Sequence, residues 1–427
     1  MHASAPQTGR TFLAGLRADL ADIVFNDTRF LAFGQLAAIF LLPITAAIII
    51  VLFGTGPEPR RNWYGEILGN DFSQIWVAGR AALEGRAAEP YDLARHLANL
   101  REAFGPDCRF AWHYPPIFLI PSAAMAWMDP QAGYLAWCAL SAAFFLFVLR
   151  RAAGRMDIAL IAFAHPLVFC NLSYGQNGLF TAGLMTLGLV LLDRRPRLAG
   201  LCFGLLAFKP HFALVAPLLL LATGRWTALM SCAATVLAVS LASVALFGIE
   251  PWIGFLHSLS STNRIILQEA ASGLDLNASA FGAVRLLGGS VAVSWAFQIA
   301  VALTALAFVL RVWRSGASPE LRAAACLCVT PLLSPYVPVY DLVPLLPATL
   351  FLGLAAVKQG GLVAHERLLI ALSPLTALVR FAAGETGFSF GLALALATFA
   401  CIAWRVGLTG LLPEGGFSLS RRAVAGS

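Results

Sequence analysis

LAGLCFGLLAFKPHFALVAPLLLLATGR, residues 198–225, is an apolar stretch broken at Lys209-Pro210, and its path through the membrane decides the topology of the protein. The part before the break, 198–208, amounts to about 11 residues or roughly 16 Å of helix. That length is too short to cross a hydrocarbon core of about 30 Å. The stretch is therefore either one kinked span or a hairpin of two short helices.

Composition places this stretch in a membrane protein. Of the 427 residues, 59% are hydrophobic and 12% are charged, whereas about 25% are charged in a soluble domain. Other apolar runs of about span length lie at 31–53, 132–149, 157–172, 178–192, 226–247, 291–310, 342–357, 367–382 and 388–404, and a tenth enters at 320 and breaks at Ser334-Pro335. These runs predict an all-α polytopic membrane protein.

Basic residues decide between the two paths. With a hairpin, the later cytoplasmic segments carry nine Arg or Lys residues and the later external segments carry only Arg264, Arg285 and Arg380. A single span would reverse the ratio and violate the positive-inside rule. We therefore predict a hairpin and about 12 transmembrane helices in one domain, 31–406, with a cytoplasmic N-terminal segment 1–30 and a cytoplasmic tail 407–427.

Two long loops, 54–131 and 248–290, then face the extracytoplasmic side, and long loops are often functional. In the first loop, apolar residues at helical spacing after Asp71 predict a helix lying along the membrane surface. Residues 114–128 are apolar, short and rich in proline, which predicts a half-buried or re-entrant helix.

Polar residues gather on the outer side of this topology, and each has a structural alternative. Asp71 is a candidate functional acid or a plain helix N-cap. The other candidates and their alternatives are Gln176 and Asn177 (caps of the next span), Tyr114 (an interfacial aromatic), Arg264 (a solvated loop charge) and Tyr340 with Asp341 (part of a helix kink).

Lys209 stands out because a charge at membrane depth costs about 2.5–3.5 kcal/mol on insertion scales. Such a lysine is usually paired or functional, and the alternative is a side chain that reaches to the interface from a helix end. A cation here suits the phosphate of a lipid-linked substrate, with His211 beside it.

Several chemistries have no support in the sequence. There is no Gly-rich phosphate loop, no DxD pair for a metal-bound nucleotide, and no HExxH or Cys/His cluster. We predict no metal and no cofactor. The net charge of +7 is typical of membrane topology and anionic lipids rather than of nucleic-acid binding.

Several separate stretches carry a family resemblance. They are NDFSQIWVAGRAALEGRAAEPYD (70–92), YPP (114–116), GQNG (175–178), FKPHFAL (208–214) and SPYVPVYD (334–341). Together they resemble the membrane glycosyltransferases of family 87, within the GT-C superfamily of polyprenyl-phosphate-sugar-dependent enzymes. The resemblance implies a GT-C fold and sugar transfer on the extracytoplasmic side, with an acid of the first external loop as base.

Carried to this chain, that base is Asp71, while Lys209, helped by His211 or Arg264, binds the donor phosphate. Tyr114, Gln176, Asn177, Tyr340 and Asp341 are expected to contact sugar or acceptor. Many family members place a histidine where this chain has Tyr340-Asp341, so the role of that segment stays open between catalysis and binding.

The expected reaction is an inverting transfer of a hexosyl unit, mannosyl in much of the wider family, to a lipid, glycan or protein acceptor. The protein is expected in the cytoplasmic (inner) membrane, with its active site facing outward and with membrane lipids as partners. A transporter or flippase of polyprenyl-linked sugars is the alternative, and a transferase of glycans or phospho-groups from another membrane family is a second. An inverted repeat would favour the transporter, and none is evident in the sequence.

Overall fold

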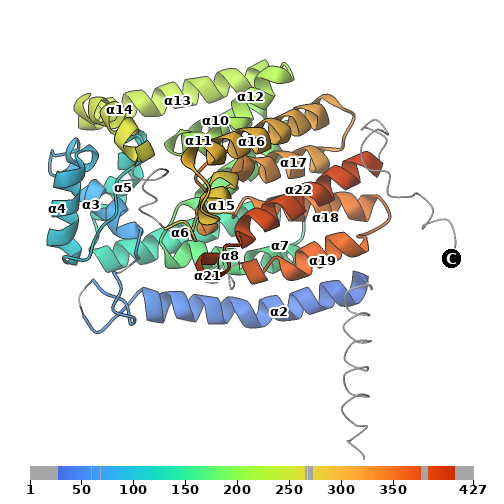
Figure 1. The fold of residues 1–427 in the computed structure, drawn as a ribbon, viewed down its shortest axis with the longest axis horizontal. Coiled ribbons are helices and arrows are strands. Elements are labelled where there is room, and N and C mark those ends of the chain that lie inside the picture. Colours follow the sequence, from blue (N-terminus) through green and yellow to red (C-terminus); the bar gives the residue numbers. More distant parts are fainter. Residues whose placement is uncertain are drawn as a thin grey trace, which may run out of the picture.

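The computed structural model describes residues 27–58, 60–67, 69–264, 267, 273–376 and 383–408, and this part of the chain is helical (Figure 1). Its only extended pairings are two isolated bridges, Arg61 with Ile67 and Asn277 with Pro338. The predicted all-α class is therefore confirmed. Most of the predicted N-terminal segment, 1–26, and of the tail, 409–427, lies outside the described residues.

Six helices in the described chain are long and apolar enough to cross a membrane. They are α2 (Asp27–Ile48) with the π-turn η1 (Ile49–Phe53), α6 (Pro130–Ala153), α13 (Trp226–Phe247), α16 (Val291–Arg314), α18 (Leu345–Lys358) preceded by η6 (Val339–Asp341), and α22 (Phe390–Leu408). A bent pair, α7 (Met156–Phe163) and α8 (Pro166–Ser173), makes a seventh if it is counted as one span. Pro166 causes that break, because a proline disfavours a helical residue before it.

The remaining apolar helices of the described chain are short, so the expected count of about 12 transmembrane helices is not confirmed. They are α5 (Leu119–Ala126) after η3 (Pro116–Phe118), α9 (Gly178–Leu191), α10 (Pro196–Leu205) with η4 (Leu206–Phe208), α11 (Pro210–Ala213) with α12 (Val215–Ala222), α17 (Pro319–Leu332) and α19 (Ala364–Leu372). A helix of 14 residues is about 21 Å long, which is shorter than the core of a bilayer. Several of these helices begin or end at polar or proline residues, and those residues contribute to the candidate site described below.

The broken stretch 198–225 is a hairpin. Helices α10 and α13 run parallel. At their starts, the guanidinium of Arg225, just before α13, forms an ion pair of 2.6 Å with Asp193, just before α10. Further along both helices, a Cβ on Gly204 would lie 2.6 Å from Cβ of Thr235. Two parallel helices require the chain between them to reverse direction, and it does so after Lys209. A single kinked span is thereby excluded.

The first long loop is a packed helical unit of α3 (Phe72–Leu83), η2 (Glu89–Tyr91), α4 (Leu93–Phe104) and α5. The expectation that α3 lies along the membrane surface is wrong, because nearly all of its residues are buried. A Cβ on Gly79 would lie 2.1 Å from the carbonyl oxygen of Ser122, so α3 and α5 touch backbone to backbone. The indole of Trp76 also donates to the carbonyl of Met128 at 2.9 Å.

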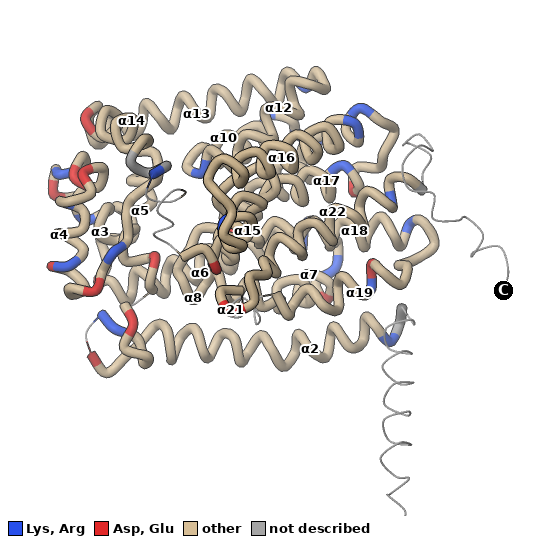
Figure 2. Tube along the Cα trace, in the orientation of Figure 1, with Lys and Arg blue, Asp and Glu red and all other residues tan. Residues whose placement is uncertain are grey.

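The opposite end of the molecule is rich in basic residues, and we call it the Arg-rich end (Figure 2). It is defined by Arg225, Arg314, Arg322 and Lys358, with Asp193 and Glu320 as anionic partners. Three contacts hold the helices together at this end. Lys358 pairs with Glu320 at 2.6 Å, and the Trp313 indole donates to the Arg322 carbonyl at 2.9 Å. The guanidinium of Arg314 donates to the Ala222 carbonyl at 3.3 Å.

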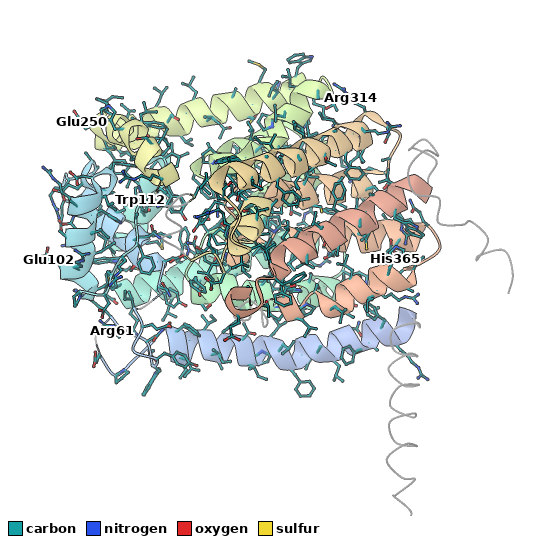
Figure 3. All side chains as sticks on the ribbon, viewed as in Figure 1. Arg61, Glu102, Trp112, Glu250, Arg314 and His365 are labelled. Carbon is teal, nitrogen blue, oxygen red and sulfur yellow. The ribbon has the colours of Figure 1, made fainter. Side chains whose placement is uncertain are left out.

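Figure 3 places Arg314 at the Arg-rich end and Glu102 of α4 at the other. Helices α9, α10, α17 and α18 each have one terminus at the Arg-rich end, so their other termini lie about 15–21 Å deeper along the bundle. The second long loop contributes α14 (Glu250–Asn263) and α15 (Ala280–Leu286), and a short helix α21 (Ala383–Thr386) precedes α22.

Candidate active site

The far termini of the short helices meet the first loop at a cluster of buried polar side chains. Asp71 comes from the start of α3, Gln176 and Asn177 from the turn between α8 and α9, Lys209 from the hairpin tip, and Asp341 from η6. Each of these five residues is no more than 7% exposed. The structure thus brings together residues that lie as far apart in sequence as 71 and 341.

The side chain of Asp71 does not cap its helix. Its backbone is already helical, with φ −64° and ψ −19°, and its carboxylate accepts no capping hydrogen bond. The N–H of Phe72 is instead bonded to the carbonyl of Gly69 at 2.7 Å. Oδ2 of Asp71 accepts from Nε2 of Gln176 at 2.6 Å. The N-cap interpretation is therefore wrong, and the carboxylate turns into the cluster.

Glycine makes this approach possible. Gly175 has a φ of +60°, and a Cβ there would lie 2.5 Å from Cβ of Phe72. A residue with a side chain would therefore hold the GQNG turn away from the start of α3. The close approach places the Gln176 amide against Asp71.

The amide of Gln176 has a fixed orientation. Its Oε1 accepts from the hydroxyl of Tyr114 at 3.2 Å and from the backbone N–H of Asn177 at 3.3 Å. Because Oε1 is held by these two donors, the Nε2 amide group of Gln176 faces Asp71. Asn177 precedes α9 without a side-chain capping bond, so its cap interpretation is wrong as well.

Lys209 forms a buried ion pair with Asp341. Its Nζ lies 2.6 Å from Oδ1 of Asp341 and 3.1 Å from Oδ1 of Asn177. The ring of Phe212 is 5.1 Å from the same nitrogen. At 4% exposure, Lys209 does not reach out to an interface, and the 334–341 break delivers its counter-ion rather than merely bending a helix.

Burial raises the pKa of Asp71 above its ordinary value. Hydrogen bonds from Gln176 and from the Tyr340 hydroxyl act against this increase. The charge of Asp341 raises the same pKa, and the charge of Lys209 lowers it. A carboxylate made more basic by burial, yet still held by donors, is suited to accept a proton.

A family model for glycosyltransferase family 87 matches residues 112–335. The chain belongs to glycosyltransferase family 87. The matched region covers just over half of the chain, including Gln176, Asn177 and Lys209, while Asp71 and Asp341 lie outside it. No curated protein and no solved structure matches the chain. The helical structure and the family together make this a membrane glycosyltransferase.

Sequence reasoning missed one residue that shapes this family 87 site. Asn171 of α8 is fully buried, and its Nδ2 donates to the carbonyl of Tyr340 at 3.0 Å. The ring of Tyr340 packs against that of Tyr174 with centroids 5.1 Å apart. Asn171 thereby fixes the segment that carries Asp341. The sequence feature that could have identified Asn171 is its position as a single amide side chain in a largely apolar helix.

Two predicted phosphate ligands of the glycosyltransferase lie outside the buried cluster. His211 is exposed and packs edge to face on Phe212, with centroids 5.0 Å apart. Arg264 is exposed on the second long loop. Their binding of a phosphate stays a prediction. In the described part of the family 87 chain, no three His, Cys, Asp or Glu side chains are grouped to hold a metal ion.

Proposed function

We propose that this glycosyltransferase moves a hexosyl unit from a polyprenyl-phosphate carrier to an acceptor hydroxyl on the extracytoplasmic side, with Asp71 as general base. The observation that supports this most is the 2.6 Å bond between Asp71 and Gln176. It holds a buried carboxylate that serves no capping role and has a neutral amide as its partner.

The two acids of the cluster differ in their partners, and this difference assigns their roles. Asp341 is compensated by the ammonium group of Lys209, which favours its charged form and holds it in place. Asp71 instead has the neutral amide of Gln176 as its partner. Paired groups whose environments differ in this way commonly divide an acid–base task between them.

The proposed step is a direct displacement. The acceptor oxygen forms a bond to the anomeric carbon while the bond from that carbon to the phosphate oxygen breaks. The electron pair of the broken bond stays on the polyprenyl phosphate, and the hydroxyl proton goes to Asp71. One displacement inverts the anomeric configuration, and a positioned base contributes about 10²–10⁴-fold to such a reaction.

Lys209 is the proposed electrostatic partner of the leaving phosphate. Its ammonium group already donates to Asn177 and Asp341 and lies 5.1 Å from the centre of the Phe212 ring. A phosphate oxygen would therefore replace one of these contacts when the donor binds. A cation already in place stabilises charge that develops on the leaving group.

The Arg-rich end supports the proposed orientation. Basic residues favour the cytoplasmic side, so the first loop and the second loop would face outward, in the cytoplasmic membrane of the cell. The cluster then lies about 15–21 Å from the inner surface, within the outer half of the bilayer. The phosphate of a bound carrier would have to reach that depth to contact Lys209.

The proposal is tested by reconstituting the purified protein in liposomes with a panel of radiolabelled polyprenyl-phosphate hexoses and a lipid and glycan extract as acceptor. Transfer by the wild type should fall by about 10²–10⁴-fold in Asp71→Asn. The matched control is Asp129→Asn, because Oδ1 of Asp129 caps α6 by accepting from the N–H groups of Gln131 and Ala132. Asparagine caps a helix as well as aspartate does, so this variant should keep its activity.

Transfer that is equal in the wild type and in Asp71→Asn would refute the assignment of the base. Movement of the labelled lipid across the bilayer without transfer to any acceptor would favour the flippase alternative instead.

A further inference from the structure

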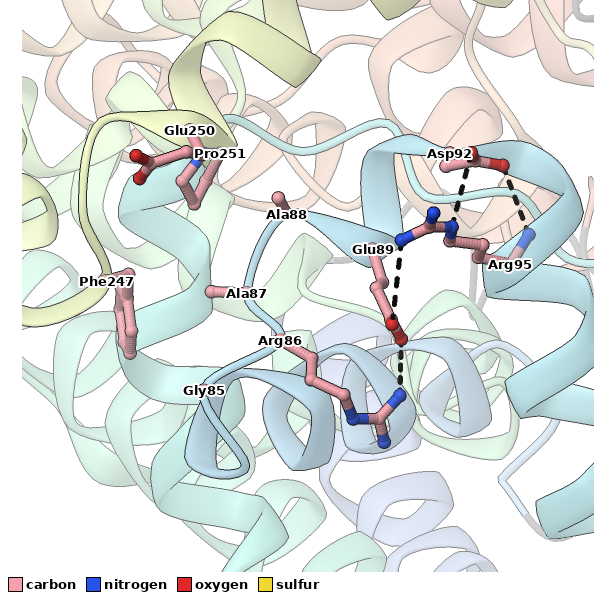
Figure 4. Close-up of a pocket in the computed structure, with 10 residues that line it drawn as sticks. All are labelled: Gly85, Arg86, Ala87, Ala88, Glu89, Asp92, Arg95, Phe247, Glu250 and Pro251. Atoms are coloured by element: carbon pink, nitrogen blue, oxygen red, sulfur yellow. Dashed lines mark hydrogen bonds and ion pairs between the residues drawn. The ribbon is translucent and has the colours of Figure 1, made fainter.

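A cavity lies at the far end of α3 from Asp71. It has a volume of about 510 Å³, and its walls come from two parts of the chain (Figure 4). One wall is the corner 85–89 with the start of α4, and the other is the junction of α13 and α14. Helix α3 has 12 residues, so about 18 Å separates this cavity from the cluster. The reacting sugar cannot occupy both places.

Half of the residues that line the cavity are charged, although only 12% of the chain is charged. The charged lining residues are Arg86, Arg95, Glu89, Asp92 and Glu250. Glu89 accepts a short hydrogen bond from Arg86 and one of 2.9 Å from Asn99. Two arginines against three acids give a local charge of −1, so a phosphate or an acidic sugar would be repelled. The cavity is therefore unsuited to the donor headgroup.

The same lining suits a neutral polyhydroxylated ligand. Guanidinium and carboxylate groups side by side offer planar sets of donors and acceptors, which match neighbouring hydroxyl groups. Phe247 and Pro251 add an apolar face on the opposite wall, against which the C–H face of a sugar ring can pack. Planar polar groups beside an aromatic ring are the chemistry that recognises carbohydrate.

The cavity is physically joined to the cluster. Tyr91 ends η2, two residues after Glu89, and its hydroxyl donates to the carbonyl of Tyr114 at 3.1 Å. The hydroxyl of Tyr114 donates to Gln176, the partner of Asp71. On the other side, a Cβ on Gly254 would lie 2.9 Å from Cβ of Tyr91, so α14 packs tightly on η2. Both walls are thereby fixed relative to the cluster.

We infer that this cavity binds a neutral oligosaccharide, the remote part of a glycan acceptor whose terminal hydroxyl reaches Asp71. This inference rests on the proposed function and gives the acceptor a chemical class: a carbohydrate chain rather than a protein or a bare lipid. The length of α3 sets the distance that such a chain has to span.

The test measures binding without donor, so that it does not depend on catalysis. The protein in lipid nanodiscs is titrated with linear manno- and gluco-oligosaccharides of two to six units, and saturation-transfer NMR reports binding. At least one longer oligosaccharide should bind, and Phe247→Ala or Arg95→Ala should weaken it about tenfold. Leu246→Ala, an exposed neighbour on α13 that does not line the cavity, should bind as the wild type does.

Asp71→Asn should also bind the oligosaccharide normally. If Asp71→Asn transfers sugar normally but oligosaccharide binding still depends on Phe247 and Arg95, the base assignment fails and the cavity assignment stands. The cavity assignment is overturned if no panel member binds, if the cavity variants bind like the wild type, or if an oligouronate binds better than the neutral sugars. Unchanged melting temperatures of the variants exclude misfolding as the cause, and Arg95 is well suited because its side chain is 68% exposed.

Discussion

Lys209 and Asp341, 132 residues apart, form an ion pair of 2.6 Å in which each side chain is only 5% exposed. Breaking a buried pair by removing one partner costs about 3–5 kcal/mol, because the other charge is left uncompensated. We expect Lys209→Met and Asp341→Leu each to lower the melting temperature strongly, and the double variant to recover much of the loss. Thermal unfolding in detergent measures this. A double variant that is less stable than both single variants would show that the pair contributes little.

The raised pKa of Asp71 predicts that its buried charge makes the native state less stable at neutral pH. The native state holds this proton more tightly than the unfolded chain, whose value is near 3.8. Stability contributed by this residue therefore falls as the pH rises through the window between 3.8 and the raised pKa. Asp71→Asn removes the buried charge and should melt at a higher temperature than the wild type at pH 7. The difference should shrink towards pH 4, and a less stable Asp71→Asn at pH 7 would contradict the burial argument.

Gln176 should set the pH dependence of transfer. Gln176→Glu replaces a donor to Asp71 with a like charge, which raises the pKa of Asp71 further. Because the base must be ionised to accept a proton, the acid limb of kcat/KM should move to higher pH, with activity at pH 6 reduced about tenfold or more. Gln176→Met loses the donor without adding a charge and should shift the limb less. Identical pH profiles for both variants would argue that Gln176 only fills space.

Gly178 keeps the amide of Asn171 close to the Tyr340 segment. A Cβ there would lie 2.4 Å from Nδ2 of Asn171 and 2.9 Å from the carbonyl oxygen of Tyr340. Gly178→Ala should therefore displace the segment that carries Asp341, reducing activity more than tenfold and lowering the melting temperature. Gly353→Ala is the control, since nothing lies within 4 Å of a Cβ at that helical glycine. Equal behaviour of the two variants would show that the close approach is not needed.

The proposed orientation can be read from cysteine labelling. Glu102 and Arg314 are exposed at opposite ends of the molecule (Figure 3), and all eight native cysteines are buried and free, which keeps the background low. In intact cells, an impermeant maleimide should label Glu102→Cys, whereas Arg314→Cys should react only after permeabilisation. The reverse pattern would place the site on the cytoplasmic side.

The hairpin could be predicted from sequence because charge distribution reports on membrane sides independently of packing. Lys209 could also be predicted as a candidate from the sequence, since a lysine in an apolar run is usually paired or functional. The partner of Lys209 could not be predicted, because it depends on how the hairpin tip meets η6, 132 residues along the chain. The same holds for the bond from Gln176 to Asp71 across 105 residues.

The predicted number of spans is not confirmed, for a physical reason that lies in the candidate site itself. Sequence windows measure apolar length, and they treat each interruption as a boundary between complete spans. In the structure, α9 begins only at the GQNG turn, and α10 with η4 and α17 end at Lys209-Pro210 and Ser334-Pro335. These interruptions assemble the cluster, so the departure from regular spans coincides with the proposed active site.

The shortness of α9, α10 and α17 also has an electrical consequence. In the proposed orientation, about two thirds of a core about 30 Å thick lies between the cluster and the cytoplasm. Moving one elementary charge across the whole membrane is worth about 2.3 kcal/mol per 100 mV, so a proton leaving Asp71 outward meets about a third of that, or about 0.8 kcal/mol. The membrane voltage, negative inside, would therefore oppose the release of that proton by an amount that depends on how deep these helices place Asp71.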